Sequence, residues 1–237
     1  MYNVIVLPAM FLRLFTFFLC VTLAGAACTL TGNLYEDNVQ PKEEDPHQEP
    51  IKPPQMTLTL DKSGIVSLGI SGSGSISINW GDGSAIQTTN IYGNNTNFTH
   101  SGNGTRTITV AGLNIMRLDC SDNQVSNMNI NEISTLTHLY CNDNVLTSLD
   151  VSGNSSLVLL LCNNNNLTYL NVNANTSLSV LNCSYNNMQS SALNSLLSFL
   201  HVNNISGGKT VILNNNTGVA SPQSLTNAIS KGWEVID

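Results

Sequence analysis

Four cysteines are the residues in this sequence whose type and spacing could most readily do chemistry, since thiolates bind zinc and thiols pair as disulfides. They stand 21 residues apart at Cys120, Cys141, Cys162 and Cys183, each with a leucine two residues before it and an asparagine three residues after it. This spacing predicts one copied unit, stacked on its neighbours about 4.8 Å apart like strands of a sheet. Sulfurs spread over three such steps cannot converge on one zinc ion, whose thiolate ligands lie about 2.3 Å from the metal.

Disulfide bonds between neighbouring cysteines remain an alternative at this point, because an exported protein meets oxidising conditions. Parallel side chains on adjacent strands keep their Cβ atoms about 4.8 Å apart, however, and a disulfide favours a separation of about 3.8 Å. We therefore expect four buried free thiols that act as small apolar residues.

The histidines and acids do not form a catalytic set. His47, His100, His138 and His201 fall in four different predicted segments, and none has a spaced nucleophile or a paired carboxylate nearby. No glycine-rich phosphate loop precedes a helix. We expect no catalytic residue, no metal site and no cofactor, so the protein is not expected to be an enzyme.

Charge is scarce in the 237 residues: 10% are charged, and the net charge is −7. Five basic residues are scattered between Lys62 and Lys231, and six acids cluster between Glu36 and Glu49. Nucleic-acid binding requires clustered lysine and arginine, and so does electrostatic docking to an anionic membrane. We therefore expect neither nucleic acid nor an anionic membrane surface as a partner.

The N-terminal segment has the pattern of an export signal. Residues 14–27 are uncharged and largely apolar, follow Arg13, and end in small residues before Cys28, which predicts a signal peptide over residues 1–27. A retained membrane span is the alternative, although the run is shorter than the roughly 20 residues that a span needs. Translation could start at Met1 or at Met10, and Met10 would leave a short basic segment before the apolar run.

The residues before Cys28 resemble a bacterial lipobox, which implies lipidation of Cys28 and attachment to a membrane through lipid alone. Gly25 departs from that pattern, so cleavage after Ala26 without lipidation is the alternative. Residues 28–54 are acidic and contain several prolines, which predicts a disordered tether.

Residues 55–111 show apolar side chains at every second position, which predicts a small antiparallel β-sandwich. The run Trp80-Gly81-Asp82-Gly83, with His100 downstream, resembles PKD-type domains. Asn79 and the short length depart from that family. Asp82 is expected to cap a turn, with calcium binding as the alternative, and Trp80 is expected in the core, with sugar stacking as the alternative.

Residues 112–237 carry the repeat. Besides the leucine and cysteine columns, further columns are apolar in every regular repeat: Val125/Leu146/Leu167/Met188, Met128/Leu149/Leu170, Ile130/Val151/Val172 and Leu136/Leu157/Leu178. The frame resembles the leucine-rich repeat of secreted bacterial proteins, and Leu149 to Asn154 matches the second half of that motif. The resemblance implies a mainly β solenoid with a parallel sheet and minor α structure, which we expect the N-terminal sandwich to cap.

Two further patterns complete the predicted solenoid. A column of asparagines (Asn123, Asn144, Asn165, Asn186 and Asn216) follows the strands, where buried amides can pair with backbone groups. The repeat then breaks into a helix from about Ser191, a strand over 210–213, a helix starting at Ser221-Pro222 and a strand over 233–236. These segments predict a C-terminal cap.

The leucine-rich-repeat resemblance makes the exposed strand positions the expected binding surface. Among polar neighbours, an apolar cluster is unexpected there, and the expected binding residues are His138, Tyr140, Leu159, Leu161, Val180 and Asn182. Cover by the sandwich, the tether or a second copy is the alternative. We expect a monomeric cell-surface or secreted module that binds an extracellular protein or glycoprotein. The alternative function is a structural envelope component that packs against sister proteins.

Overall fold

The computed structural model describes residues 52–202 and 208–237, which fall within one compact unit. The predicted signal peptide, the lipidation site Cys28, both start codons and most of the tether lie outside the described residues. Within the described residues, no helix is both long enough and apolar enough to span a membrane.

The first part of the unit is a β-module formed by four strands and the first half of a fifth. Its strands are β1 (Gln55–Asp61), β2 (Gly64–Asn79), β3 (Gln87–Tyr92), β4 (Thr96–Gly102) and β5 (Thr105–Asp119). All their pairings within the module are antiparallel. The alternating apolar residues are buried, as the period of two predicts for a sheet with one face on a core. The sandwich form of this module stays a prediction.

Strand β5 joins the module to the repeats. Its residues Thr105–Ala111 pair with β1, whereas Arg117–Asp119 form the strand of the first repeat and pair with β7 of the next one. The boundary predicted between residues 111 and 112 therefore falls inside β5, and backbone hydrogen bonding continues across it. A second link comes from β6 (Val125–Asn129), which pairs antiparallel with β1.

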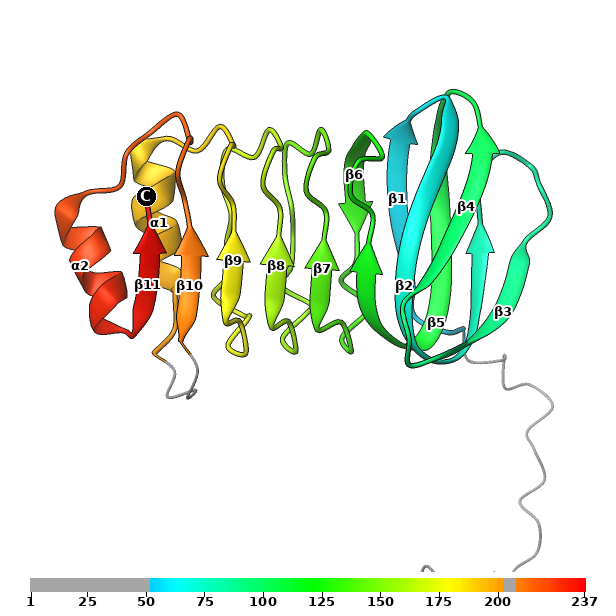
Figure 1. Ribbon diagram of the computed structural model, residues 1–237, viewed down its shortest axis with the longest axis horizontal. Helices are drawn as coiled ribbons and strands as arrows, with labels where there is room; N and C mark the ends of the chain where they lie inside the picture. The colour runs from blue at the N-terminus through cyan, green and yellow to red at the C-terminus, as the bar shows by residue number, and fades with distance from the viewer. Residues whose placement is uncertain (1–51, 203–207) are drawn as a thin grey trace, which may run out of the picture. The chain divides into compact units, whose positions relative to one another are not determined.

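The repeats form a solenoid of parallel strands (Figure 1). After β5 come β7 (His138–Tyr140), β8 (Leu159–Leu161), β9 (Val180–Asn182), β10 (Lys209–Ile212) and β11 (Trp233–Ile236). From β5 to β9, each residue pairs with the residue 21 positions later. We call the units that begin at Arg117, His138, Leu159 and Val180 coils 1 to 4. The described chain is thus mainly β, with one mixed sheet and two helices.

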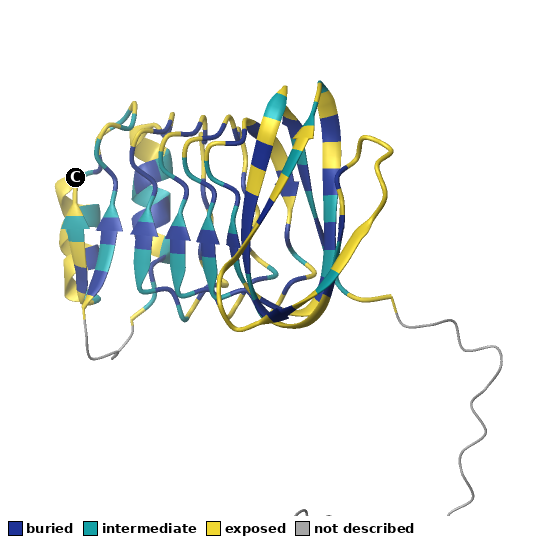
Figure 2. Ribbon diagram, turned by 45° about the vertical axis from the view of Figure 1, so that its right-hand side comes forward, coloured by how far each residue is buried: buried dark blue, intermediate teal, exposed yellow. Residues whose placement is uncertain are grey.

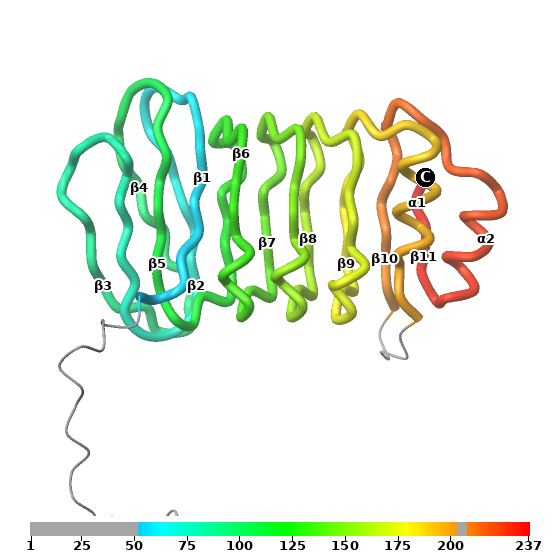
Figure 3. The backbone as a smooth tube through the Cα atoms, turned by 180° about the vertical axis from the view of Figure 1, so that it is seen from behind, coloured from blue at the N-terminus to red at the C-terminus, as the bar shows by residue number. Residues whose placement is uncertain are grey.

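Buried residues recur from coil to coil along the stack (Figure 2), and their apolar side chains form one core. The leucine and cysteine columns of the strands are fully buried, and so are nearly all of the later apolar columns. No single coil could bury its own apolar side, so stacking is what excludes water from these residues. The part of each coil that runs behind the strands is called the return stretch (residues 125–130, 146–151 and 167–172), and it is seen from behind in Figure 3.

The C-terminal elements follow the predicted signals. Helix α1 (Ser190–Phe199) buries Leu193, Leu196 and Leu197. Helix α2 (Pro222–Ser230) starts after Ser221, whose side chain accepts a hydrogen bond from the backbone N–H of Ser224. Gly232 has a φ of 82°, a left-handed conformation that ends the helix before β11. The predicted helix start and final strand are confirmed.

Candidate functional site

The exposed side of the parallel strands, called the strand face, contains all six predicted binding residues. Backbone pairing aligns them in two rows across the sheet. One row is Arg117, His138, Leu159, Val180, Thr210 and Glu234, and the other is Asp119, Tyr140, Leu161, Asn182, Ile212 and Ile236.

Burial separates the two sides of each strand. In β7, β8 and β9 the central leucine is buried, and the residue on either side of it is half-buried. This alternation is what the period of two predicts for a strand with one side on a core. Helix α1 lies behind the strands in Figure 1, on the side of the return stretches.

The β-module does not cover the strand face. It meets coil 1 edge-on, because β2 pairs with Arg117–Asp119 of β5 and β1 pairs with β6. Within the described residues, the β-module is therefore not the segment that covers the apolar cluster.

One end of the strand face is polar and internally paired. Arg117 Nη1 donates to the Tyr140 hydroxyl at 2.9 Å, and Nη2 lies 3.3 Å from Asp119 Oδ2. The guanidinium carbon also lies 3.9 Å from the centre of the Tyr140 ring, a cation–π contact. Tyr140 was predicted from sequence as part of an apolar cluster, but these contacts make it part of a charged network.

His138 stands beside this network. Its Nδ1 lies 2.8 Å from Thr137 Oγ1. Partial burial lowers the pKa of His138, and the positive charge of Arg117 lowers it further. The imidazole is therefore neutral at neutral pH and offers a hydrogen-bonding group rather than a charge.

The other end of the strand face is apolar. Leu159 and Leu161 lie beside Val180 and Asn182. The row of Leu161 continues to Ile212, whereas the row of Leu159 continues to Thr210 and Glu234, whose side chains are hydrogen-bonded at 3.3 Å. Ile236, which is 43% exposed, extends the apolar surface by one more strand. The sequence places Ile212 at an exposed strand position, but neither Ile212 nor Ile236 was among the expected binding residues, because the repeat is interrupted before β10. The predicted final strands were the signal that could have found them.

The cysteines lie on the opposite side of the sheet, in the core. All four are free and fully buried. Burial raises the pKa of Cys120 and of Cys162 to about 12, and it raises the pKa of Cys141 and of Cys183 well above the ordinary value. Thiols in this state are unreactive apolar packing groups.

The asparagine column is confirmed as a ladder of buried amides. Asn165 shows the pattern: its Oδ1 accepts from the N–H of Leu146 at 2.9 Å, and its Nδ2 donates to the carbonyls of Cys141 and Cys162. Equivalent bonds recur in the ladder at Asn144, Asn186 and Asn216. Each amide thereby ties its own coil to the preceding one.

Two features of the buried amides were not revealed by the sequence. Asn123 exchanges two hydrogen bonds with the backbone of Ser67 in β2, so the β-module takes the place of a preceding coil. A second set of fully buried amides, Asn154 and Asn175, donates to carbonyls of the neighbouring coil on the return side.

Asp82 does cap its turn. Its Oδ1 accepts from the backbone N–H of Ser84 at 3.1 Å, and its Oδ2 lies 2.6 Å from His100 Nε2. The hydrogen bonds from Ser84 and His100 lower the pKa of Asp82 well below its usual range. His100 in turn stacks on Trp80, which is buried as expected. Residues 52–202 and 208–237 hold no cluster of three or more acidic, histidine or cysteine side chains suited to a metal ion.

Comparisons with known proteins complete the description. No protein-family model matches the chain, and the search of curated proteins gives no match. Among solved structures, the chain is similar to the functional domain of InlJ from Listeria monocytogenes, described as including a cysteine ladder, with 25% identity over 52% of this chain and a TM-score of 0.41. It is also similar to an internalin, inlF, from Listeria monocytogenes, with 22% identity over 49% of this chain and a TM-score of 0.35. The aligned regions cover 24% and 39% of those two chains.

Proposed function

We propose that this protein is a non-catalytic binding module that recognises an extracellular protein or glycoprotein through the strand face. One observation carries the proposal: Leu159 and Leu161 stand half-exposed beside Val180, on a surface whose other end is charged and internally paired. Contiguous apolar side chains on an otherwise polar surface are typical of partner sites.

The two ends of the face would have different roles in such a complex. The leucines and Val180 supply apolar area whose burial stabilises a complex at roughly 25 cal/mol per Å². Arg117, Asp119 and His138 are held in place by contacts on their own chain, so they lose little freedom on binding and can set the orientation of the partner. The row of Leu161 continues to Ile212 and Ile236, so apolar side chains occur on four neighbouring strands of the face.

The resemblances found in the sequence support an exported location. A signal peptide would export the protein, and a lipidated Cys28 with a disordered tether would hold the leucine-rich repeat outside the cell. We expect the exported protein to be a monomer. The PKD-like assignment of residues 55–111 belongs to the same proposal. Fatty-acid labelling of the wild type, lost on Cys28→Ala, would establish the anchor.

The test of the strand face uses the double variant Leu159→Asp/Leu161→Asp. Wild-type protein and variant are compared on an array of purified extracellular-matrix and mucosal glycoproteins, and on extracted bacterial envelope proteins. The matched control is Val219→Asp/Ile229→Asp, which places two acids at exposed aliphatic positions elsewhere. Wild type and control should bind the same array member with equal affinity, and the double leucine variant should bind it at least tenfold more weakly.

Two results would contradict the proposal. Equal binding by the double leucine variant would exclude the strand face as the binding surface. Binding to envelope proteins alone would instead favour the alternative, a structural component that packs against sister proteins.

A further inference from the structure

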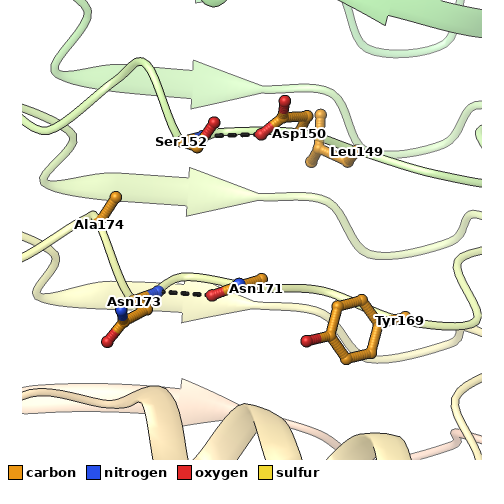
Figure 4. A pocket seen from close by; sticks show the side chains of 7 residues that line it. All are labelled: Leu149, Asp150, Ser152, Tyr169, Asn171, Asn173 and Ala174. Carbon is orange, nitrogen blue, oxygen red and sulfur yellow. Dashed lines mark hydrogen bonds between the residues drawn. The ribbon is translucent and has the colours of Figure 1, made fainter.

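A hollow of about 440 Å³ opens on the return stretches of coils 2 and 3, away from the strand face (Figure 4). Coil 2 contributes Leu149, Asp150 and Ser152 to its wall, and coil 3 contributes Tyr169, Asn171 and Asn173. Because it lies behind the strands, a site here would be independent of the proposed function.

The hollow arises from one departure from the repeat. In the column that contains Tyr169, the exposed position is occupied by Ser148 one coil earlier and by Asn127 two coils earlier. A large ring beside a short serine leaves a step in the surface. Tyr169 is 48% exposed, and its ring packs edge-on against Phe199 of α1, with centroids 6.3 Å apart at 82°. This contact restricts the ring while leaving much of it in solvent.

The polar groups around the ring are held by the turns of the coil. Asp150 accepts from the backbone N–H of Ser152 at 2.9 Å and from Asn131 Nδ2 at 2.8 Å, and these bonds lower the pKa of Asp150. Asn171 Oδ1 accepts from the backbone N–H of Asn173 at 2.9 Å. Within the described residues, the Tyr169 hydroxyl, Asn171 Nδ2 and the side-chain amide of Asn173 have no hydrogen-bonding partner on the protein.

This arrangement combines an apolar wall with fixed donors and acceptors, the pattern of small-molecule sites. Leu149 and the Tyr169 ring offer apolar surface, the amides offer both donors and acceptors, and the ionised Asp150 only accepts. A pyranose has a matching character, because one face of the ring presents C–H groups while its hydroxyls donate and accept. Anionic sugars are disfavoured, since the wall contains one carboxylate and no cation.

We propose that this hollow binds one unit of a neutral saccharide, with Tyr169 as the stacking platform and Asn171, Asn173 and Asp150 as the hydroxyl partners. The site is shallow and buries few atoms, so a dissociation constant on the order of 1 mM is expected for a short oligosaccharide.

The experiment titrates purified protein with defined trisaccharides and follows binding by saturation-transfer NMR. Neutral probes of gluco, manno, galacto and N-acetylated series are compared with sialylated and sulfated ones. At least one neutral series should bind saturably, and Tyr169→Ala should weaken it at least tenfold. Tyr169→Phe should retain most of the affinity, because it keeps the ring. Ala174→Gln, at the rim of the hollow, should also weaken binding by occupying the space while leaving the ring intact.

Two controls separate this site from other surfaces. Tyr92→Ala removes a tyrosine that is 81% exposed in the β-module, and Leu159→Asp/Leu161→Asp alters the strand face; both should bind the saccharide as wild type does. Absence of neutral saccharide binding up to about 10 mM would overturn the proposal. Binding of anionic probes alone, or full affinity in Tyr169→Ala or Ala174→Gln, would overturn it equally.

Discussion

At the scale of single residues, the asparagine ladder shows how one side chain can organise a coil. A buried amide is costly unless its donors and acceptors are paired, and Asn165 pairs with three backbone groups from coils 2 and 3. Its neighbour Asn164 has a φ of 53°, a left-handed conformation that asparagine and aspartate tolerate better than most residues. Tyr185 occupies the equivalent position one coil later with a φ of 52°, so the same turn there is strained. Neighbouring asparagines in this protein therefore have different and specific roles.

The ladder makes a quantitative prediction. Asn165→Ala leaves three buried backbone groups without their partner, and we expect it to lower the free energy of unfolding by about 3 kcal/mol. The matched control is Asn166→Ala at an exposed position, which should change it by less than about 0.5 kcal/mol. Urea denaturation of both variants checks this, and equal stabilities would show that the amide bonds are dispensable.

At the scale of elements, the three-residue strands separate the buried side chains of a coil from its exposed ones. The central leucine and the cysteine that follows each strand enter the core, whereas the flanking residues form the strand face. The same alternation that builds the core therefore defines the binding surface. It also keeps the four thiols apart, since each is buried in its own coil among apolar side chains.

Burial of the thiols predicts protection from alkylation. At pH 8, iodoacetamide should leave Cys120, Cys141, Cys162 and Cys183 unmodified in the native protein and modify all four in concentrated urea without reductant. Burial excludes the reagent, and the raised pKa values keep the groups protonated.

Peptide mapping by mass spectrometry reads the outcome, and Ser148→Cys, at an exposed position, serves as the reactive control. Rapid native labelling of any of the four would show that the coil is open. Resistance in urea would reveal a disulfide instead.

At the scale of the whole molecule, the β-module and the solenoid share one core and one strand. The buried apolar cluster extends from Met56 to Trp233 without interruption. Strand β5 pairs with β1 near its start, with β2 along most of its length and with β7 at its end, and Asn123 bonds to Ser67. An open end of a solenoid exposes apolar side chains and unpaired backbone groups. At coil 1, β1 and β2 of the β-module pair with the backbone.

This sharing predicts a single unfolding transition. A fragment of residues 52–237 should unfold cooperatively in urea, with circular dichroism and Cys141 labelling giving the same midpoint. A fragment of residues 112–237 begins inside β5 and lacks β1 and β2, so it should not fold. A 112–237 fragment that protects Cys141 from alkylation would show that the repeats are autonomous.

Much of this architecture could be predicted from the sequence because a stack repeats one environment. Each column of Leu139, Cys141 and Asn144 meets copies of itself, so a local period is enough to assign inward and outward positions, and the six predicted binding residues do share one face. The helix start at Ser221-Pro222 was equally local, since a cap depends on the next three residues.

The sequence did not predict the contacts between segments that are not equivalent positions of the repeat. The pairing of β6 with β1, the bonds between Asn123 and Ser67, and the contacts of Arg117 with Tyr140 join residues whose neighbours differ from coil to coil. The hollow at Tyr169 depends on the side chains of two coils and on Phe199 of α1. A period in the sequence records interactions between equivalent positions, whereas contacts between inequivalent ones follow from packing in three dimensions.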